Sequence, residues 1–87
     1  MARIIIPATL RTLCGGSQQL EVDASTVDEL LRAVDARCPG FYARVVDEGR
    51  LRPELAFAVD GEILPLALHD AIAPAAELTI VPALGGG

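Results

Sequence analysis

The stretch from Thr26 to Gly40 constrains the fold most, because it predicts one amphipathic helix with both ends defined. Thr26 and Glu29 have the spacing of a capping box, in which a hydroxyl caps the first turn and a carboxylate reaches back. Apolar residues then recur with helical spacing on one face: Val27, Leu30, Leu31 and Val34. Cys38-Pro39-Gly40 ends the helix. At about 18 Å, such a helix is long enough to cross one small sheet.

Short strand patterns flank this helix on both sides. Residues 1–8 are rich in β-branched side chains, and residues 17–23 alternate apolar and polar side chains after a Gly15-Gly16 turn. Residues 55–60 alternate as well, and Asp60-Gly61 predicts a tight hairpin that returns along residues 62–65. The last strand pattern covers residues 78–82, whereas residues 41–53 are less regular, with a short helical turn near Phe41.

The order β-β-α-β-β-β predicts an α+β fold over residues 1–82. The helix can serve as the crossover that parallel strand pairing requires, so the first and last strands are expected to be central and parallel. The helix stripe then packs on one face of the sheet. This is the β-grasp arrangement of ubiquitin, a mixed sheet of four to five strands with one crossing helix.

Residues 83–87, Ala83-Leu84-Gly85-Gly86-Gly87, form a predicted flexible, glycine-rich C-terminal tail. Glycine has no Cβ, so the end of this chain is thin and lets another protein's backbone approach closely. A frayed end or a remnant of cloning is the alternative. Against it, the glycines follow a predicted core strand with almost no spacer, in a chain that otherwise reads as one small domain presenting that strand.

Composition and charge exclude several classes of function. Apolar residues make up 52% of the chain, enough for one core in 87 residues, yet no apolar run approaches the roughly 20 residues of a membrane helix. The net charge is −5 without a basic cluster, which argues against nucleic acid and favours protein partners with basic docking faces. The first residues do not resemble a signal peptide, so we expect a cytoplasmic protein without a membrane partner.

Few side chains suggest catalysis or metal binding. His69, the only histidine, is interpreted as an ordinary loop residue. Cys14 and Cys38 are too far apart in sequence for a metal knuckle, and no metal site is expected. In a cytoplasmic protein we predict reduced thiols rather than a disulfide, with Cys38 as a small buried hydrophobe and Cys14 in a loop. The chain therefore suggests a substrate or carrier, not an enzyme.

The order of these motifs resembles the ThiS/MoaD sulfur-carrier family of ubiquitin-like proteins. The similarity lies in the capped helix from Thr26 to Leu31, the hairpin from Phe57 to Glu62 and the end from Thr79 to Gly87. The opening from Ile6 to Arg11, with its Gly-Gly, is similar to the CysO-type branch. Ala75-Ala76 and Gly85 depart from the family pattern, in a turn and in the tail respectively.

The resemblance implies that the chemistry belongs to the carboxylate of Gly87. A ThiF/MoeB-like, ubiquitin-activating-type adenylyltransferase would use ATP and magnesium to adenylate it, and a sulfur donor would convert it to a thiocarboxylate. Gly85 and Gly86 would let the tail thread into partner enzymes, including a sulfur-accepting synthase. The protein itself would bind no cofactor. The pathway favoured by the resemblance is synthesis of cysteine or of a natural product, and a molybdopterin synthase small subunit is the alternative.

Docking on partners is assigned to outward apolar residues near the tail: Ile5, Val81 and Leu84. Ordinary sheet surface is the alternative for these three residues. Two other classes of function stay open. A ubiquitin-like modifier would attach Gly87 to a target lysine, and a plain β-grasp binding module would make no chemical use of its glycines.

Overall fold

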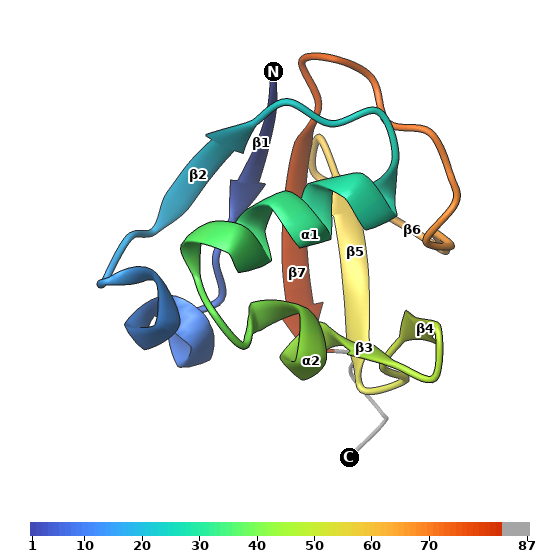
Figure 1. Ribbon diagram of the computed structural model, residues 1–87. Helices are drawn as coiled ribbons and strands as arrows, with labels where there is room; N and C mark the ends of the chain where they lie inside the picture. The colour runs from blue at the N-terminus through green and yellow to red at the C-terminus, as the bar shows by residue number, and fades with distance from the viewer. Residues whose placement is uncertain (83–87) are drawn as a thin grey trace.

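The computed structural model describes residues 1–82, in which a five-stranded mixed sheet carries helix α1 across one face (Figure 1). The strands lie in the order β2-β1-β7-β5-β6. Their bounds are Gln19–Val22 for β2, Ala2–Ile5 for β1, Glu77–Pro82 for β7, Leu55–Val59 for β5 and Glu62–Leu64 for β6. The predicted β-grasp fold is confirmed.

The two terminal strands are central and parallel, as predicted. Ile4 of β1 is paired with Leu78 of β7, and both side chains point into the core. Two parallel neighbours need a long crossover connection between them. Helix α1 provides it here, because it lies in the chain between the β1–β2 hairpin and the strands that end with β7. The other neighbours pair antiparallel, including the hairpin of β5 and β6. At its turn, Asp60 has φ 50° and Gly61 has φ 87°, the two positive values that a tight hairpin requires.

Helix α1 spans Val27–Arg37 and begins at the predicted cap. The hydroxyl oxygen of Thr26 accepts a hydrogen bond from the backbone N–H of Glu29 at 3.2 Å. The carboxylate of Glu29 accepts one from the N–H of Ser25 at 2.8 Å, one residue before the position expected in a capping box. The predicted apolar stripe of α1 is fully buried, and it forms the core together with the inner sheet face and Phe41.

The connections hold more structure than the sequence patterns predict. The segment after β1 is a 3-10 helix, η1, over Ala8–Cys14, which ends at Gly15 with φ 64°. Helix α2 covers Phe41–Val45, where a helical turn was expected. A small separate sheet follows, with β3 at Val46–Asp47 and β4 at Arg50–Leu51.

The prediction of two reduced cysteines is wrong, because Cys14 and Cys38 form a disulfide. Cys14 is the last residue of η1, and Cys38 follows the last turn of α1. The fold brings their Cα atoms to 4.6 Å, within the range that a disulfide spans. Cys38 is buried as predicted, but it is covalently bonded. No pattern in the sequence indicates that the connection after β1 folds back onto the end of α1.

Reduction of this disulfide should destabilise the domain strongly. The bond joins residues 24 positions apart, and closing a loop of this length stabilises a fold by about 3.5 kcal/mol through the entropy of the unfolded chain. For a domain of this size we expect the melting temperature to fall by about 15 °C or more. Denaturant unfolding with and without dithiothreitol measures the effect. Equal midpoints for the two forms would contradict it.

Candidate functional site

The candidate site lies where β7 leaves the sheet. β7 pairs with β5 as far as Pro82, which is opposite Leu55, and the chain then passes into residues 83–87. Leu84, Gly85, Gly86 and Gly87 lie outside the described residues, so their assigned roles stay predictions. What can be described is the surface from which the tail starts.

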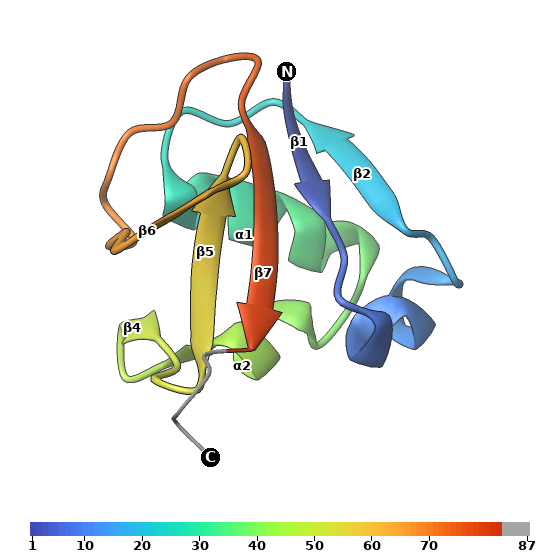
Figure 2. The ribbon, with the colours of Figure 1, turned by 180° about the vertical axis from the view of Figure 1, so that it is seen from behind.

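No helix covers the outer face of the sheet in the described part of the chain (Figure 2). The register places a band of small or apolar side chains on this face, and we call it the open-face patch: Ile5, Ala56, Ala58, Ile63, Thr79 and Val81. Ile5 and Val81, both predicted docking residues, are partly exposed here. Ile63 is 66% exposed and was missed, although its place between Glu62 and the inward Leu64 indicates an outward side chain.

The outer face of the sheet is charged at one end of the strands and apolar at the other. Arg3, Glu21 and Glu77 lie on it at the end near the start of β7, where the Arg3 guanidinium is 3.4 Å from the Glu77 carboxylate. The apolar residues Ile5 and Val81 lie nearer the end from which the tail leaves. A partner that buries apolar surface would therefore bind the half of the face closest to the tail.

A groove runs beside the end of β7, because β1 turns away early. Pairing of β1 with β7 ends at Ile5 and Thr79, and Pro7 has no N–H with which to extend the ladder. The space is bordered by the start of η1. It consists of two adjoining hollows that share Pro7, Thr9 and Ile80, and we call them together the tail groove. The first hollow is also lined by Ile5, Ile6, Ala8, Arg11 and Thr79, and the second by Leu10, Arg44, Glu54, Leu55 and Val81. Its walls are mostly apolar.

Arg11 supplies a fixed cation at this groove. Its Nε donates a hydrogen bond to the carbonyl oxygen of Ile6 at 3.1 Å, so the guanidinium is held against the bend after β1. The remaining guanidinium nitrogens can bind a carboxylate in two-pronged geometry. Arg11 is not among the predicted docking residues, because nothing in the sequence pattern indicates that η1 lies beside β7.

A second polar cluster lies on the outer side of α1. The hydroxyl of Tyr42 donates to one carboxylate oxygen of Asp28 at 2.5 Å, and Arg32 Nε donates to the other at 2.7 Å. The Arg32 guanidinium also lies over the Tyr42 ring, 4.5 Å from its centroid. These contacts tie α1 to α2 on the side of the molecule opposite the open-face patch.

Replacement of Tyr42 by Phe should raise the pKa of Asp28. The Tyr42 hydrogen bond, followed by that of Arg32, lowers the pKa of this carboxyl, and the same bond to Asp28 raises the pKa of Tyr42. A lowered folded-state pKa stabilises the fold above the unfolded value of about 3.9, and this stabilisation is lost as the pH falls through the folded value. NMR titration of the Asp28 carboxyl carbon measures the shift, and Asp28→Asn assigns the signal. An unchanged titration in Tyr42→Phe would contradict the assigned cause.

The described residues offer little chemistry of their own. Residues 1–82 contain no group of three or more His, Cys, Asp or Glu side chains placed to hold a metal ion. His69 is exposed, with Nε2 3.9 Å from an Asp70 oxygen. Of the helices in this part of the chain, none has the length and apolar character needed to cross a membrane.

Comparison with known proteins agrees with this arrangement. Residues 4–87 match the model of the ThiS family. A chain in the crystal structure of the Amycolatopsis orientalis BexX/CysO complex is 32% identical, with a TM-score of 0.89 and complete coverage of both chains. CysO from Mycobacterium tuberculosis is 26% identical, with a TM-score of 0.87, over 97% of this chain and 100% of that one.

A third solved structure broadens the comparison. SAMP1 from Haloferax volcanii is 30% identical, with a TM-score of 0.75, over 99% of this chain and 98% of that one. No curated protein sequence matches the chain. The family match covers all but three of the 87 residues, including the C-terminal glycines. The chain belongs to the ThiS family of small ubiquitin-like sulfur carriers.

Proposed function

We propose that the protein carries sulfur as a thiocarboxylate on Gly87 and donates it to a biosynthetic enzyme. The observation that carries this proposal is the path of β7. This central strand is paired on both sides within the sheet and ends at Pro82, and Gly85-Gly86-Gly87 follow it within five residues in the sequence. The membership of the ThiS family supports the proposal.

The C-terminal carboxylate needs activation before it can accept sulfur. Its pKa lies near 3.5, so at neutral pH it is an anion and a poor electrophile. A ThiF/MoeB-like adenylyltransferase would join it to the α-phosphorus of magnesium-bound ATP and release pyrophosphate. A sulfur donor would then attack the acyl carbon and displace AMP, which leaves the thiocarboxylate. ATP and magnesium are bound by this partner, and the carrier supplies only the tail and the docking surface.

The receiving enzyme is proposed to make cysteine or a sulfur-containing natural product. The likeness to two CysO structures, one of them in a BexX/CysO complex, supports this choice over a molybdopterin synthase. The synthase would bind the open-face patch and take the sulfur from Gly87. We place these reactions in the cytoplasm, and we expect no membrane or nucleic-acid partner.

Protein modification is the second candidate function. The likeness to SAMP1, a small archaeal modifier protein, favours it. In that case the acyl-adenylate or a derived thioester would react with the lysine ε-amine of another protein. This chain contains no lysine, so it could not accept a second copy of itself through an ε-amine.

Intact-mass spectrometry separates these functions. The protein is incubated with ATP, magnesium, the adenylyltransferase and sulfide, and with a control reaction that lacks ATP. A mass increase equal to one exchange of oxygen for sulfur, located on the C-terminal peptide, is the expected result. Conjugates of higher mass would favour the modifier, and an unchanged mass in both reactions would overturn the carrier proposal.

A further inference from the structure

Residues of helix η1 line both hollows of the tail groove. Ala8 and Arg11 line the first hollow, Leu10 lines the second, and Thr9 is shared by both. A change in the position of η1 would therefore change both halves of the groove. The tail leaves the sheet at the same place, so the order of η1 bears on any partner that must hold the tail.

Few noncovalent interactions fix η1 in the described part of the chain. Its recorded hydrogen bonds are local, such as those from the N–H of Gly16 to Arg11 and from the Arg11 guanidinium to Ile6. Leu10 is buried, and Leu13 packs partly against the core. The covalent link from Cys14 to Cys38 is what joins the end of η1 to α1.

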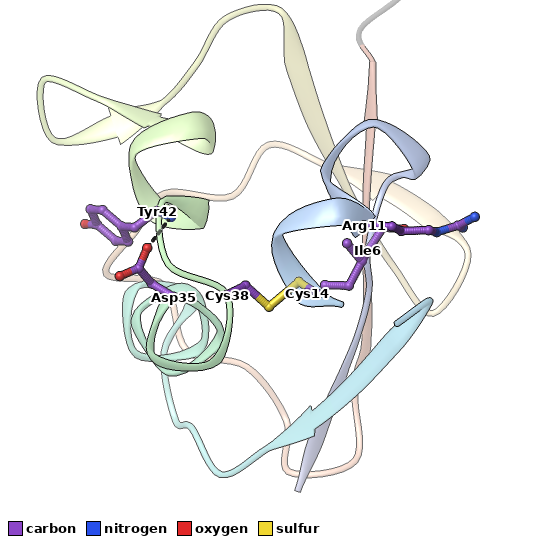
Figure 3. The surroundings of a disulfide bond; sticks show 6 residues. All are labelled: Ile6, Arg11, Cys14, Asp35, Cys38 and Tyr42. Atoms are coloured by element: carbon purple, nitrogen blue, oxygen red, sulfur yellow. Dashed lines mark hydrogen bonds between the residues drawn. A yellow bond between two sulfur atoms is a disulfide. The ribbon is translucent and has the colours of Figure 1, made fainter. Parts of the chain in front are cut away.

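The disulfide connects a firm element to a weakly held one. Cys38 is 1% exposed, and its N–H donates to the carbonyl oxygen of Val34 at 2.8 Å, so its position is set by α1. Cys14 is partly exposed, so it is the more accessible of the two residues to an attacking thiol. Figure 3 shows the bond bridging the two elements, with Arg11 extending away from it toward the outside.

We propose that Cys14 and Cys38 are a reversible redox site that controls the shape of the tail groove. In the oxidised form, the bond holds η1 against α1 and completes the groove. Reduction by two thiols breaks the sulfur–sulfur bond, gives each cysteine one electron and one proton, and oxidises the two thiols to a disulfide. The reverse thiol–disulfide exchange uses a low-molecular-weight disulfide as the oxidant, releases it as two thiols and re-forms the Cys14–Cys38 bond, so the ratio of thiols to disulfides in the cell sets which form predominates.

Release of η1 should weaken docking through entropy. A segment held by few long-range contacts opens locally at low cost, and a partner that needs its ordered position must restore that order on binding. If the ordered position is occupied a tenth of the time, apparent affinity falls about tenfold. The oxidised carrier would thus be the form better prepared for its partner.

NMR relaxation of the protein alone tests the first part of the proposal, that reduction of the disulfide makes η1 mobile. We expect backbone order parameters of residues 9–14 to fall from about 0.85 in the oxidised form to below about 0.6 after dithiothreitol, while those of β5 and β7 stay high. Alkylation followed by intact mass counts the free thiols in each sample. Order parameters of η1 that stay at rigid values in a fully reduced sample would overturn the proposal.

Two variants separate this effect from general destabilisation. Val27→Ala removes buried volume from α1 without touching the disulfide, and it should leave the order parameters of η1 unchanged. The double variant Cys14→Ser/Cys38→Ser should behave like the reduced form and be insensitive to dithiothreitol. Loosening of η1 in Val27→Ala to the same extent would show a nonspecific effect and overturn the proposal.

Adenylation kinetics test the second part of the proposal, that reduction weakens docking on the adenylyltransferase. This part rests on the proposed function. With the adenylyltransferase, the KM for the carrier should rise about tenfold on reduction with little change in kcat, and the double variant should show the high KM with or without dithiothreitol. An equal KM for both redox forms would overturn control of docking. Absence of adenylation in both forms would contradict the proposed function instead, and the relaxation result would then decide on the redox site alone.

Discussion

Removal of Gly86 and Gly87 should abolish formation of the thiocarboxylate and leave the melting temperature nearly unchanged. All core side chains of the described chain lie between Ala2 and Ile80, so the deletion removes no buried apolar surface among them. Changes that remove no buried contact alter the free energy of unfolding by about 0.5 kcal/mol or less, which corresponds to a shift in melting temperature of at most about 4 °C for a domain of this size. The proposed activation, by contrast, would require the terminal carboxylate to reach the α-phosphate of ATP bound to another protein.

The truncated chain is a strict test, because it still ends in a glycine carboxylate. Gly85 then carries the acid group, with the same chemistry but a tail two residues shorter. Intact mass after incubation with ATP and the adenylyltransferase measures conversion, and calorimetry measures the melting temperature. Phe57→Ala serves as the comparison for lost stability, since emptying a buried aromatic site costs about 3–5 kcal/mol. Conversion of the truncated protein at the rate of the intact one would refute the assigned role of the tail.

The fold could be predicted from the sequence because its local signals agree with one another. The cap at Thr26, the apolar stripe of α1 and the Asp60-Gly61 turn each specify an element by themselves. Only one simple packing satisfies all of them, with the helix on one face of the sheet and the terminal strands in its centre. The parallel pairing of β1 and β7 followed from that packing.

Features that depend on long-range contacts were not predictable. The link between Cys14 and Cys38 requires η1 to return to the end of α1, and no spacing in one sequence reports that return. The small sheet of β3 and β4 has two-residue strands, too short for an alternating pattern. Reduced thiols were predicted because disulfides are rare in cytoplasmic proteins in general. The closeness of Cys14 and Cys38 is a property of this particular fold.

Some features of the candidate site could likewise be predicted from the sequence, and others could not. Alternation along β1 and β7 was sufficient to place Ile5 and Val81 on the outer face. The tail groove could not be foreseen, since it exists because β1 stops pairing at Ile5 and η1 lies beside the uncovered part of β7. Arg11 gains its place at the groove only through that arrangement.

Replacement of Val81 by Glu should strongly weaken activation by the adenylyltransferase while the domain stays folded. Val81 belongs to both the open-face patch and the wall of the tail groove, and it is the last residue before Pro82. Burying its new carboxylate against an apolar partner surface would leave a desolvated charge. We expect an increase in KM of about thirtyfold, the effect of losing a contact worth about 2 kcal/mol. Because Val81 is partly exposed, the charge stays hydrated in the free protein.

Ala36→Glu provides the matched control for this prediction. It adds the same charge at an exposed position of α1, on the opposite side of the sheet. Its KM should equal that of the unmodified protein, and circular dichroism should show that both variants are folded. If the two variants lost activity equally, total charge would explain the loss. If Val81→Glu had no effect, the partner would have to reach the tail without contacting the open-face patch at this end of β7, and the docking role of Val81 would be wrong.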